Sequence, residues 1–195
     1  MSVLTADEVI AVIEHGFART TRPPAAFLQG SYEGCEPGEA IAPFLEIEDW
    51  RGIPSATLDT AYTALSFFSE AGFRFFLPAF MVADVRDELQ TADPVFHLTH
   101  GFKRISVDTP NGSVTTGGTT LLNPKRYGAI SWDDHARYRL SVFAREEAQA
   151  IVAYLIWRRE NALLAITREA ITIALDGFWI ERSESAPPAD ALGGS

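Results

Sequence analysis

The segment from Leu65 to Val85, LSFFSEAGFRFFLPAFMVADV, limits the fold of this chain more than any other stretch. It holds six of the thirteen phenylalanines. Arg74 is its one basic residue, and Pro78 lies near its middle. Aromatic side chains bury the largest apolar areas in protein cores. Its apolar residues follow helical spacing: Phe73, Phe76, Leu77, Phe80 and Met81. We therefore expect a core helix that begins after Ser69 as N-cap and is kinked or broken at Pro78.

Helical periodicity covers most of the remaining chain. Thr5 and Glu8 have the spacing of a capping box, which predicts a first helix over about residues 6–19. Further helices are expected after Pro54 and after Ser131. Residues 145–176 contain neither glycine nor proline, so they form either one long helix bent near Asn161 or two helices.

Residues 95–128 have a different pattern. Weak alternation over residues 104–108, the dipeptide Asn111-Gly112 and a threonine- and glycine-rich stretch to Leu121 predict a small β-hairpin insertion at about 104–121, or an ordered loop crossing the helical body. The small, polar residues 183–195 predict a disordered tail. The predicted fold is mainly α: a single-domain helical bundle over residues 1–182, followed by that tail.

Charge and composition restrict the partners. The chain of 195 residues has a formal net charge of −10, which argues against nucleic acid and against an anionic membrane surface. It has one cysteine, Cys35, and therefore no disulfide within the chain. It has no uncharged apolar run of 18 residues, and its N-terminal stretch lacks the basic start of a secretory signal. We expect a soluble cytoplasmic protein and, where it has a partner, a basic protein.

The run Phe73–Phe80, FRFFLPAF, resembles a core motif close to F-R-Y-Y-L-P-A-Y of a bacterial family of domains of unknown function. Gln149 with Tyr154-Leu155, and Ala174-Leu175 with Trp179, are similar to later helices of that family, so the resemblance covers about residues 5–181. Phenylalanines stand here where the motif has tyrosines. The resemblance implies a bacterial origin and one fold unit, and it implies no activity or active site.

Histidines supply the sharpest candidate chemistry. His97 and His100 are close in sequence, and Asp134 and His135 follow the predicted helix start at Ser131. Two or three imidazoles with one carboxylate suit zinc or iron, so these four residues are a candidate metal site. The spacing is loose and lacks the glutamate of the zinc-protease helix motif. The alternative interpretation places the histidines in a turn and on the surface.

Three other residues are candidates for binding. Arg74 lies among aromatic residues, so it either stacks on a ring, pairs with a buried acid or binds an anion. Trp157 lies on the opposite side of its helix from Ile151 and Leu155, so it is either buried on a second face or exposed for a partner. Trp50 is a further aromatic candidate.

Acidic residues have a simpler interpretation. Asp84, Asp87 and Glu88 share one helix face at positions i, i+3 and i+4, which is typical of the solvated side of a helix. The neighbouring acids Glu46 and Asp49, with Glu48 between them, are interpreted in the same way.

The leading hypothesis is a non-enzymatic protein-binding domain that needs no cofactor, for example an inhibitor or immunity-type protein that covers a basic partner. A metal-dependent hydrolase that uses the His/Asp group is one alternative. A homo-oligomeric structural domain is the other.

Overall fold

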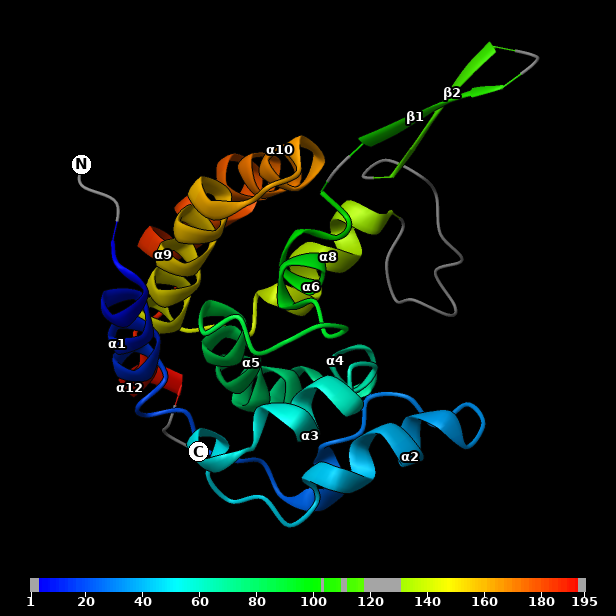
Figure 1. Cartoon of the computed structure of the whole chain (residues 1–195). Helices are drawn as coiled ribbons and strands as arrows, with labels where there is room; N and C mark the ends of the chain where they lie inside the picture. Colours follow the sequence, from blue (N-terminus) through cyan, green and yellow to red (C-terminus); the bar gives the residue numbers. More distant parts are fainter. Residues whose placement is uncertain (1–3, 103, 110–111, 118–130, 193–195) are drawn as a thin grey trace.

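The computed structural model describes residues 4–102, 104–109, 112–117 and 131–192, and its fold is mainly α, as predicted (Figure 1). Short helices η1 (Ala25–Phe27), η2 (Ala42–Phe44) and η3 (Trp50–Gly52) join the longer ones. The α-helices are α1 (Ala6–Gly16), α2 (Glu36–Ile41), α3 (Ser55–Thr60), α4 (Ala64–Phe67), α5 (Glu70–Val85), α6 (Pro94–Thr99), α8 (Trp132–Leu140), α9 (Arg145–Asn161), α10 (Ala165–Ala174), α11 (Ile180–Ser185) and α12 (Ala189–Leu192).

Helix α5 is the centre of the core. The Ser69 side chain accepts a hydrogen bond from the backbone N–H of Gly72, which confirms the predicted N-cap. The helix continues through Pro78, so of the expected kink or break at this residue the break is not found. Twelve of its 16 residues are buried, and this packing outweighs the loss of one backbone donor at the proline.

Phenylalanine rings connect α5 to the chain before it. The ring centroids of Phe44 and Phe76 are 5.0 Å apart, and those of Phe68 and Phe76 are 4.9 Å apart. Such offset and edge contacts add stability beyond the buried area alone. The aromatic run therefore lies within the hydrophobic core.

Helices α1 and α9 pack closely because Gly16 has no side chain. A Cβ atom at Gly16 would lie 2.7 Å from the Ala150 Cβ and 2.8 Å from the Glu146 carbonyl oxygen. At the other end of α1 the Thr5 and Glu8 capping box is present as predicted. The helix ends at Gly16, three residues before the expected end.

Residues 145–176 form two helices, which resolves the alternative left open by the sequence. Ala162 and Leu164 are extended, with ψ of 129° and 130°, and separate α9 from α10. The Arg168 Nη1 donates to the carbonyl oxygen of Ala162 at 2.5 Å, which holds this turn. After α10 the chain continues through a π-helical turn, η4 (Leu175–Trp179), into α11.

Strands β1 (Arg104–Thr109) and β2 (Gly112–Gly117) pair antiparallel, with Val107 opposite Val114, and extend away from the helices (Figure 1). The expected insertion at 104–121 also includes residues 110–111 and 118–121, which lie outside the described residues. The insertion as a whole therefore stays a prediction.

The structure differs from the expected disordered tail over residues 183–192. Ala186 is buried, the Arg145 backbone N–H donates to the Pro187 carbonyl oxygen at 2.9 Å, and the Ala189 N–H donates to the Glu146 carboxylate at 2.9 Å. These contacts satisfy backbone groups at two helix starts at once, a benefit that the local composition does not reveal. No helix in the described ranges is long and apolar enough to cross a bilayer.

Candidate functional site

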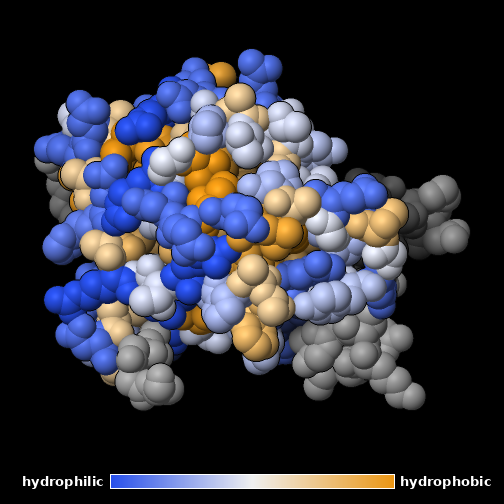
Figure 2. Space-filling model, turned by 90° about the horizontal axis from the view of Figure 1, so that it is seen from below, coloured by the Kyte–Doolittle hydropathy of each residue, from blue (hydrophilic) through white to orange (hydrophobic). Residues whose placement is uncertain are grey.

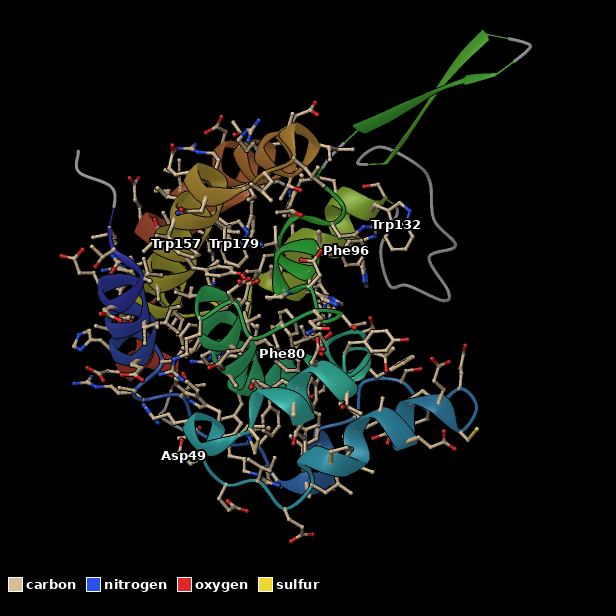
Figure 3. All side chains as sticks on the ribbon, in the orientation of Figure 1. Asp49, Phe80, Phe96, Trp132, Trp157 and Trp179 are labelled. Atoms are coloured by element: carbon tan, nitrogen blue, oxygen red, sulfur yellow. The ribbon has the colours of Figure 1, made fainter. Side chains whose placement is uncertain are left out.

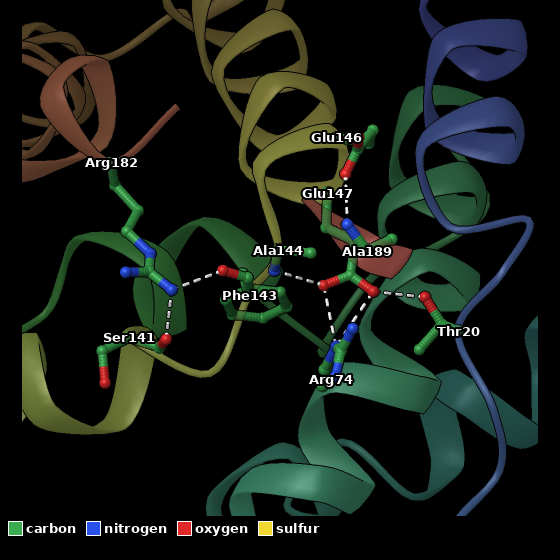
Figure 4. A network of polar contacts seen from close by, with 9 residues as sticks. All are labelled: Thr20, Arg74, Ser141, Phe143, Ala144, Glu146, Glu147, Arg182 and Ala189. Atoms are coloured by element: carbon green, nitrogen blue, oxygen red, sulfur yellow. Dashed lines mark hydrogen bonds and ion pairs between the residues drawn. The ribbon is translucent and has the colours of Figure 1, made fainter. Parts of the chain in front are cut away.

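Arg74 is paired inside the fold. Its Nε donates to both carboxylate oxygens of Glu147, at 2.9 and 2.8 Å, and Glu147 is 1% exposed (Figure 4). The Ala144 backbone N–H, at 2.8 Å, and the Thr20 hydroxyl also donate to this carboxylate. The buried charge thus has the partners that burial requires. The ion-pair interpretation of Arg74 is confirmed, and a role in binding anions stays a prediction.

A second arginine fixes the start of α9 next to this pair. The Arg182 Nη2 donates to the carbonyl oxygens of Ser141 and Phe143, the latter at 2.6 Å (Figure 4). This contact joins α11 to the turn between α8 and α9. The whole network in Figure 4 is therefore structural: it connects four segments far apart in the sequence.

The two candidate tryptophans are engaged within the protein. Trp50 is 2% exposed, and the Arg51 guanidinium carbon lies 4.5 Å from its ring centroid. Trp157 is partly buried against the core. Trp50 consequently has almost no surface to offer a partner, and a binding role for Trp157 stays a prediction.

Asp84 is largely buried rather than solvated. Its Oδ2 accepts from the Tyr154 hydroxyl and lies 3.1 Å from the Arg158 Nε. Burial raises the pKa of Asp84, against the opposing effects of Arg158 and Tyr154, and burial also raises the pKa of Tyr154. The sequence places Asp84 on a polar helix face, but α9 covers that face with polar partners of its own.

Helices α6 and α8 bring the candidate histidines together. The His100 ring centroid lies 4.7 Å from that of Phe96 and 5.2 Å from that of Trp132, whose ring is 5.9 Å from that of His135 (Figure 3). The ring centroid of His97 lies 5.3 Å from that of Phe96. The structure therefore brings together the two histidine-bearing segments, which the sequence alone left open.

Burial and nearby positive charge lower the pKa of two of these imidazoles, those of His97 and His100. Burial, with Arg139 and His100 nearby, lowers the pKa of His97 to about 3. Partial burial, His135 and Arg139 lower the pKa of His100. The Arg139 guanidinium itself lies over the Phe73 ring, 4.5 Å from its centroid, and donates to the Leu65 carbonyl oxygen.

The carboxylate of the candidate metal site belongs to Asp134, in the first turn of α8. Asp134 serves the start of α8: its Oδ2 accepts from the Ser131 hydroxyl at 2.8 Å, and its N–H donates back to that oxygen at 3.1 Å. Within the described part of the chain, no three His, Cys, Asp or Glu residues are grouped to hold a metal ion. The buried Arg139 beside His97 also opposes a bound cation.

A third area, which sequence reasoning missed, is strongly acidic. Residues 23–50 contain six carboxylates and no lysine or arginine. All six are exposed. Glu48 lies 3.6 Å from Arg22, and Asp49 lies 3.2 Å from Arg51, so two of them are paired at the surface. The six residues are Glu33, Glu36, Glu39, Glu46, Glu48 and Asp49.

An open groove of about 490 Å³ lies beside one of these carboxylates, Glu39, between the α2–η2 segment and α3. Figure 2 shows this side of the molecule, where apolar surface is surrounded by hydrophilic side chains. We call the groove, together with the six carboxylates, the acidic groove. Small side chains leave the hollow open. Its lining is Glu39, Ala40, Pro43, Ala56, Thr57, Thr60, Ala61 and Thr63.

Large apolar side chains are exposed close to these acids in the sequence. Phe27 is 65% exposed, Tyr32 is 72% exposed and Leu45 is 39% exposed. The sequence carries one signal of this acidic area, the absence of lysine and arginine from residues 23–50. The groove itself was not visible, because its two walls come from separate helices.

Comparison with known proteins gives a single assignment. No curated protein and no solved structure matches the chain. The family of unknown function DUF6714 matches residues 5–183, nearly the whole described fold and including the aromatic run, and the chain therefore belongs to this family.

Proposed function

We propose that this chain is a non-enzymatic protein-binding domain whose acidic groove holds a basic segment of a partner protein, as an inhibitor or immunity-type protein would. One observation carries the proposal. Glu39 lies in the wall of a groove of about 490 Å³, and the other five exposed carboxylates lie within ten residues of it in the sequence.

The chemistry of the groove favours a partner with both basic and apolar side chains. Concentrated surface carboxylates attract a basic partner over long range and speed its association. The alanine, proline and threonine-methyl surfaces of the groove accept an apolar side chain. Exposed Tyr32 is an aromatic residue of the kind enriched at protein interfaces.

The size of the groove limits what it takes. Helices α2 and α3 have six residues each, and so are each about 9 Å long. The groove therefore fits a short segment, with basic residues flanking one or two apolar anchors. The groove is too short to cover the surface of a whole folded partner.

The experiment neutralises the groove without changing side-chain shape. In Glu36→Gln/Glu39→Gln/Glu46→Gln, three exposed carboxylates become amides. The matched control, Asp176→Asn/Glu181→Gln/Glu184→Gln, removes the same charge from exposed positions elsewhere. A photo-crosslinker at Thr60 in cells of the natural host identifies the partner, and titration calorimetry then measures both variants against it.

The groove variant should bind about tenfold more weakly, because three exposed charges of about 0.5 kcal/mol each sum to about 1.5 kcal/mol. The control should bind within about threefold of the wild type, and rising salt should weaken the wild type most. Equal affinity of the groove variant and the control for the crosslinked partner would refute the proposal.

A further inference from the structure

The C-terminal end of the described chain lies against the start of α9. We call residues 187–192 the C-terminal strap. The Arg145 backbone N–H donates to the carbonyl oxygen of Pro187 at 2.9 Å. The Ala189 N–H donates to the Glu146 carboxylate at 2.9 Å (Figure 4). Because main-chain hydrogen bonds of this kind supply affinity when a protein binds a peptide, the strap contacts α9 as a bound peptide does.

A charged contact joins the strap to the segment that follows α1. Arg19 forms an ion pair with Asp190, and the two side chains are 70% and 75% exposed. Exposed ion pairs hold a segment only weakly. Residues 187–191 are all exposed or half-buried, so polar contacts at the surface carry their attachment. Segments with few buried contacts open locally without unfolding of the rest.

The residue before the strap is firmly held. Ala186 is buried, and its carbonyl oxygen accepts from the Arg145 Nε at 3.0 Å. The family match also ends before the strap, at residue 183. These observations place the boundary between the fold and the strap at Ala186.

The surface under the strap extends further than the strap does. Ala189 forms one wall of a hollow of about 250 Å³ between the end of α1 and the start of α9. A second hollow, of about 310 Å³, shares His15, Gly16 and Glu146 with the first. We call the two hollows, with Arg19 and Arg145, the α1–α9 surface. The second hollow is lined further by Ala11, Val12, Gln149 and Ala150.

We propose that the α1–α9 surface is a docking site for a carboxylate-bearing peptide segment of a partner protein, and that the C-terminal strap occupies this site within the chain until such a segment displaces it. The partner's carboxylate replaces that of Asp190 at Arg19, and one of its carbonyl oxygens replaces that of Pro187 at the Arg145 N–H. A small apolar side chain in the second hollow gives the partner a contact beyond those of the strap. The site shares no residue with the acidic groove and does not depend on the proposed function.

A fluorescent peptide with the sequence of residues 187–192, capped at both ends, tests the proposal on the full-length chain. Ala189→Pro/Asp190→Asn releases the strap, because it removes two of the three contacts described above. The released chain should bind the peptide with a dissociation constant on the order of 100 μM, measured by fluorescence anisotropy. The wild type should bind about tenfold more weakly, since its own strap competes at an effective concentration in the millimolar range. Glu184→Gln is the control, because it removes a charge from an exposed residue of α11 and should leave the strap in place.

A charge exchange tests the contact at Arg19 separately. Arg19→Glu in the released chain should weaken peptide binding about fivefold or more, since it places like charges against one another. A peptide with lysine in place of Asp190 should restore binding to this variant. Absence of peptide binding by the folded released chain, or equal affinity for the two peptides in both backgrounds, would overturn the proposal.

Hydrogen exchange of the wild type measures the opening of the strap without any substitution. The N–H groups of Ala189 and Arg145, which contact Glu146 and the strap, should have protection factors about tenfold or more below that of Ala148. The Ala148 N–H donates to the Ala144 carbonyl oxygen within α9. Equal protection of the three groups would show that the strap does not open on its own and would contradict the displacement.

Discussion

The carboxylate of Glu147 accepts hydrogen bonds from three separate segments of the chain. It accepts from Arg74 on α5, from Thr20 after α1 and from the Ala144 backbone before α9. A buried charge of this kind adds little net stability when compared with an apolar replacement, but removing one partner leaves the other uncompensated. The ion pair of Glu147 with Arg74 thus connects α9 to α5.

We expect Glu147→Gln to lower the free energy of unfolding by about 3–5 kcal/mol, because Arg74 then lacks its counter-ion. The double variant Arg74→Met/Glu147→Gln should lose less than the sum of the two single variants. Urea denaturation of the four proteins measures this coupling. Strict additivity would show that the pair contributes no interaction energy.

His97 gives the fold a dependence on pH. Its pKa in the folded protein, about 3, lies below the ordinary value of 6.5, so protonation favours the unfolded chain. Above about pH 6.5 His97 is neutral in both states and does not lower the free energy of unfolding. As the pH falls from 6.5 toward 3, protonation of the unfolded chain lowers that free energy progressively. Between pH 7 and pH 5 the loss from this residue should be about 2 kcal/mol.

The control for that prediction is His97→Gln, which cannot be protonated. Asp84 has a raised pKa and changes stability in the opposite direction, so the difference between wild type and variant is the informative quantity. The free energy of unfolding of the wild type minus that of the variant, measured at pH 7, 6 and 5, should decrease by about 2 kcal/mol as the pH falls. A constant difference across this range would contradict the prediction.

Helices differ in how far their local sequence determines them. The side-chain caps at Thr5, Ser69 and Ser131 are all present, because each cap depends only on residues within one turn. The unbroken course of α5 across Pro78 was not predictable from the local sequence. It depends on burial by neighbouring helices, which outweighs the proline's local preference.

The ordered residues 183–192 and the acidic groove were missed for the same physical reason. Each depends on contacts between segments that are distant in sequence: α11 and α12 with α9, and α2 with α3. The convergence of the histidine-bearing segments was foreseen as one outcome. Ser131 caps the start of α8, and its hydroxyl oxygen accepts from the backbone N–H of Asp134, so this arrangement depends on local hydrogen bonds alone.

The α1–α9 contact yields a prediction for two whole helices. Gly16→Val places side-chain atoms where the Ala150 Cβ and the Glu146 carbonyl already lie within 3 Å of a Cβ. We expect a loss of about 1–3 kcal/mol, measured by thermal unfolding. Gly52→Ala is the control, because a Cβ there meets nothing within 4 Å. Unchanged stability of Gly16→Val would mean that the two helices can separate without loss.

Across the whole molecule, charge is distributed unevenly. Nine of the 26 carboxylates and only two of the 16 basic residues lie in the first fifty positions. In the fold those residues gather on α1, α2 and the segments that follow α2, while α10 lies at the opposite end (Figure 1). One end of the molecule is therefore strongly acidic, whereas residues 162–175 at the other end carry one charge of each sign.

The position of α10 opposite α2 and α3 has a consequence for mutagenesis (Figure 1). The effects of substitutions at distant sites without shared partners add. Substitutions in the acidic groove and on α10 should therefore change the free energy of unfolding independently of one another.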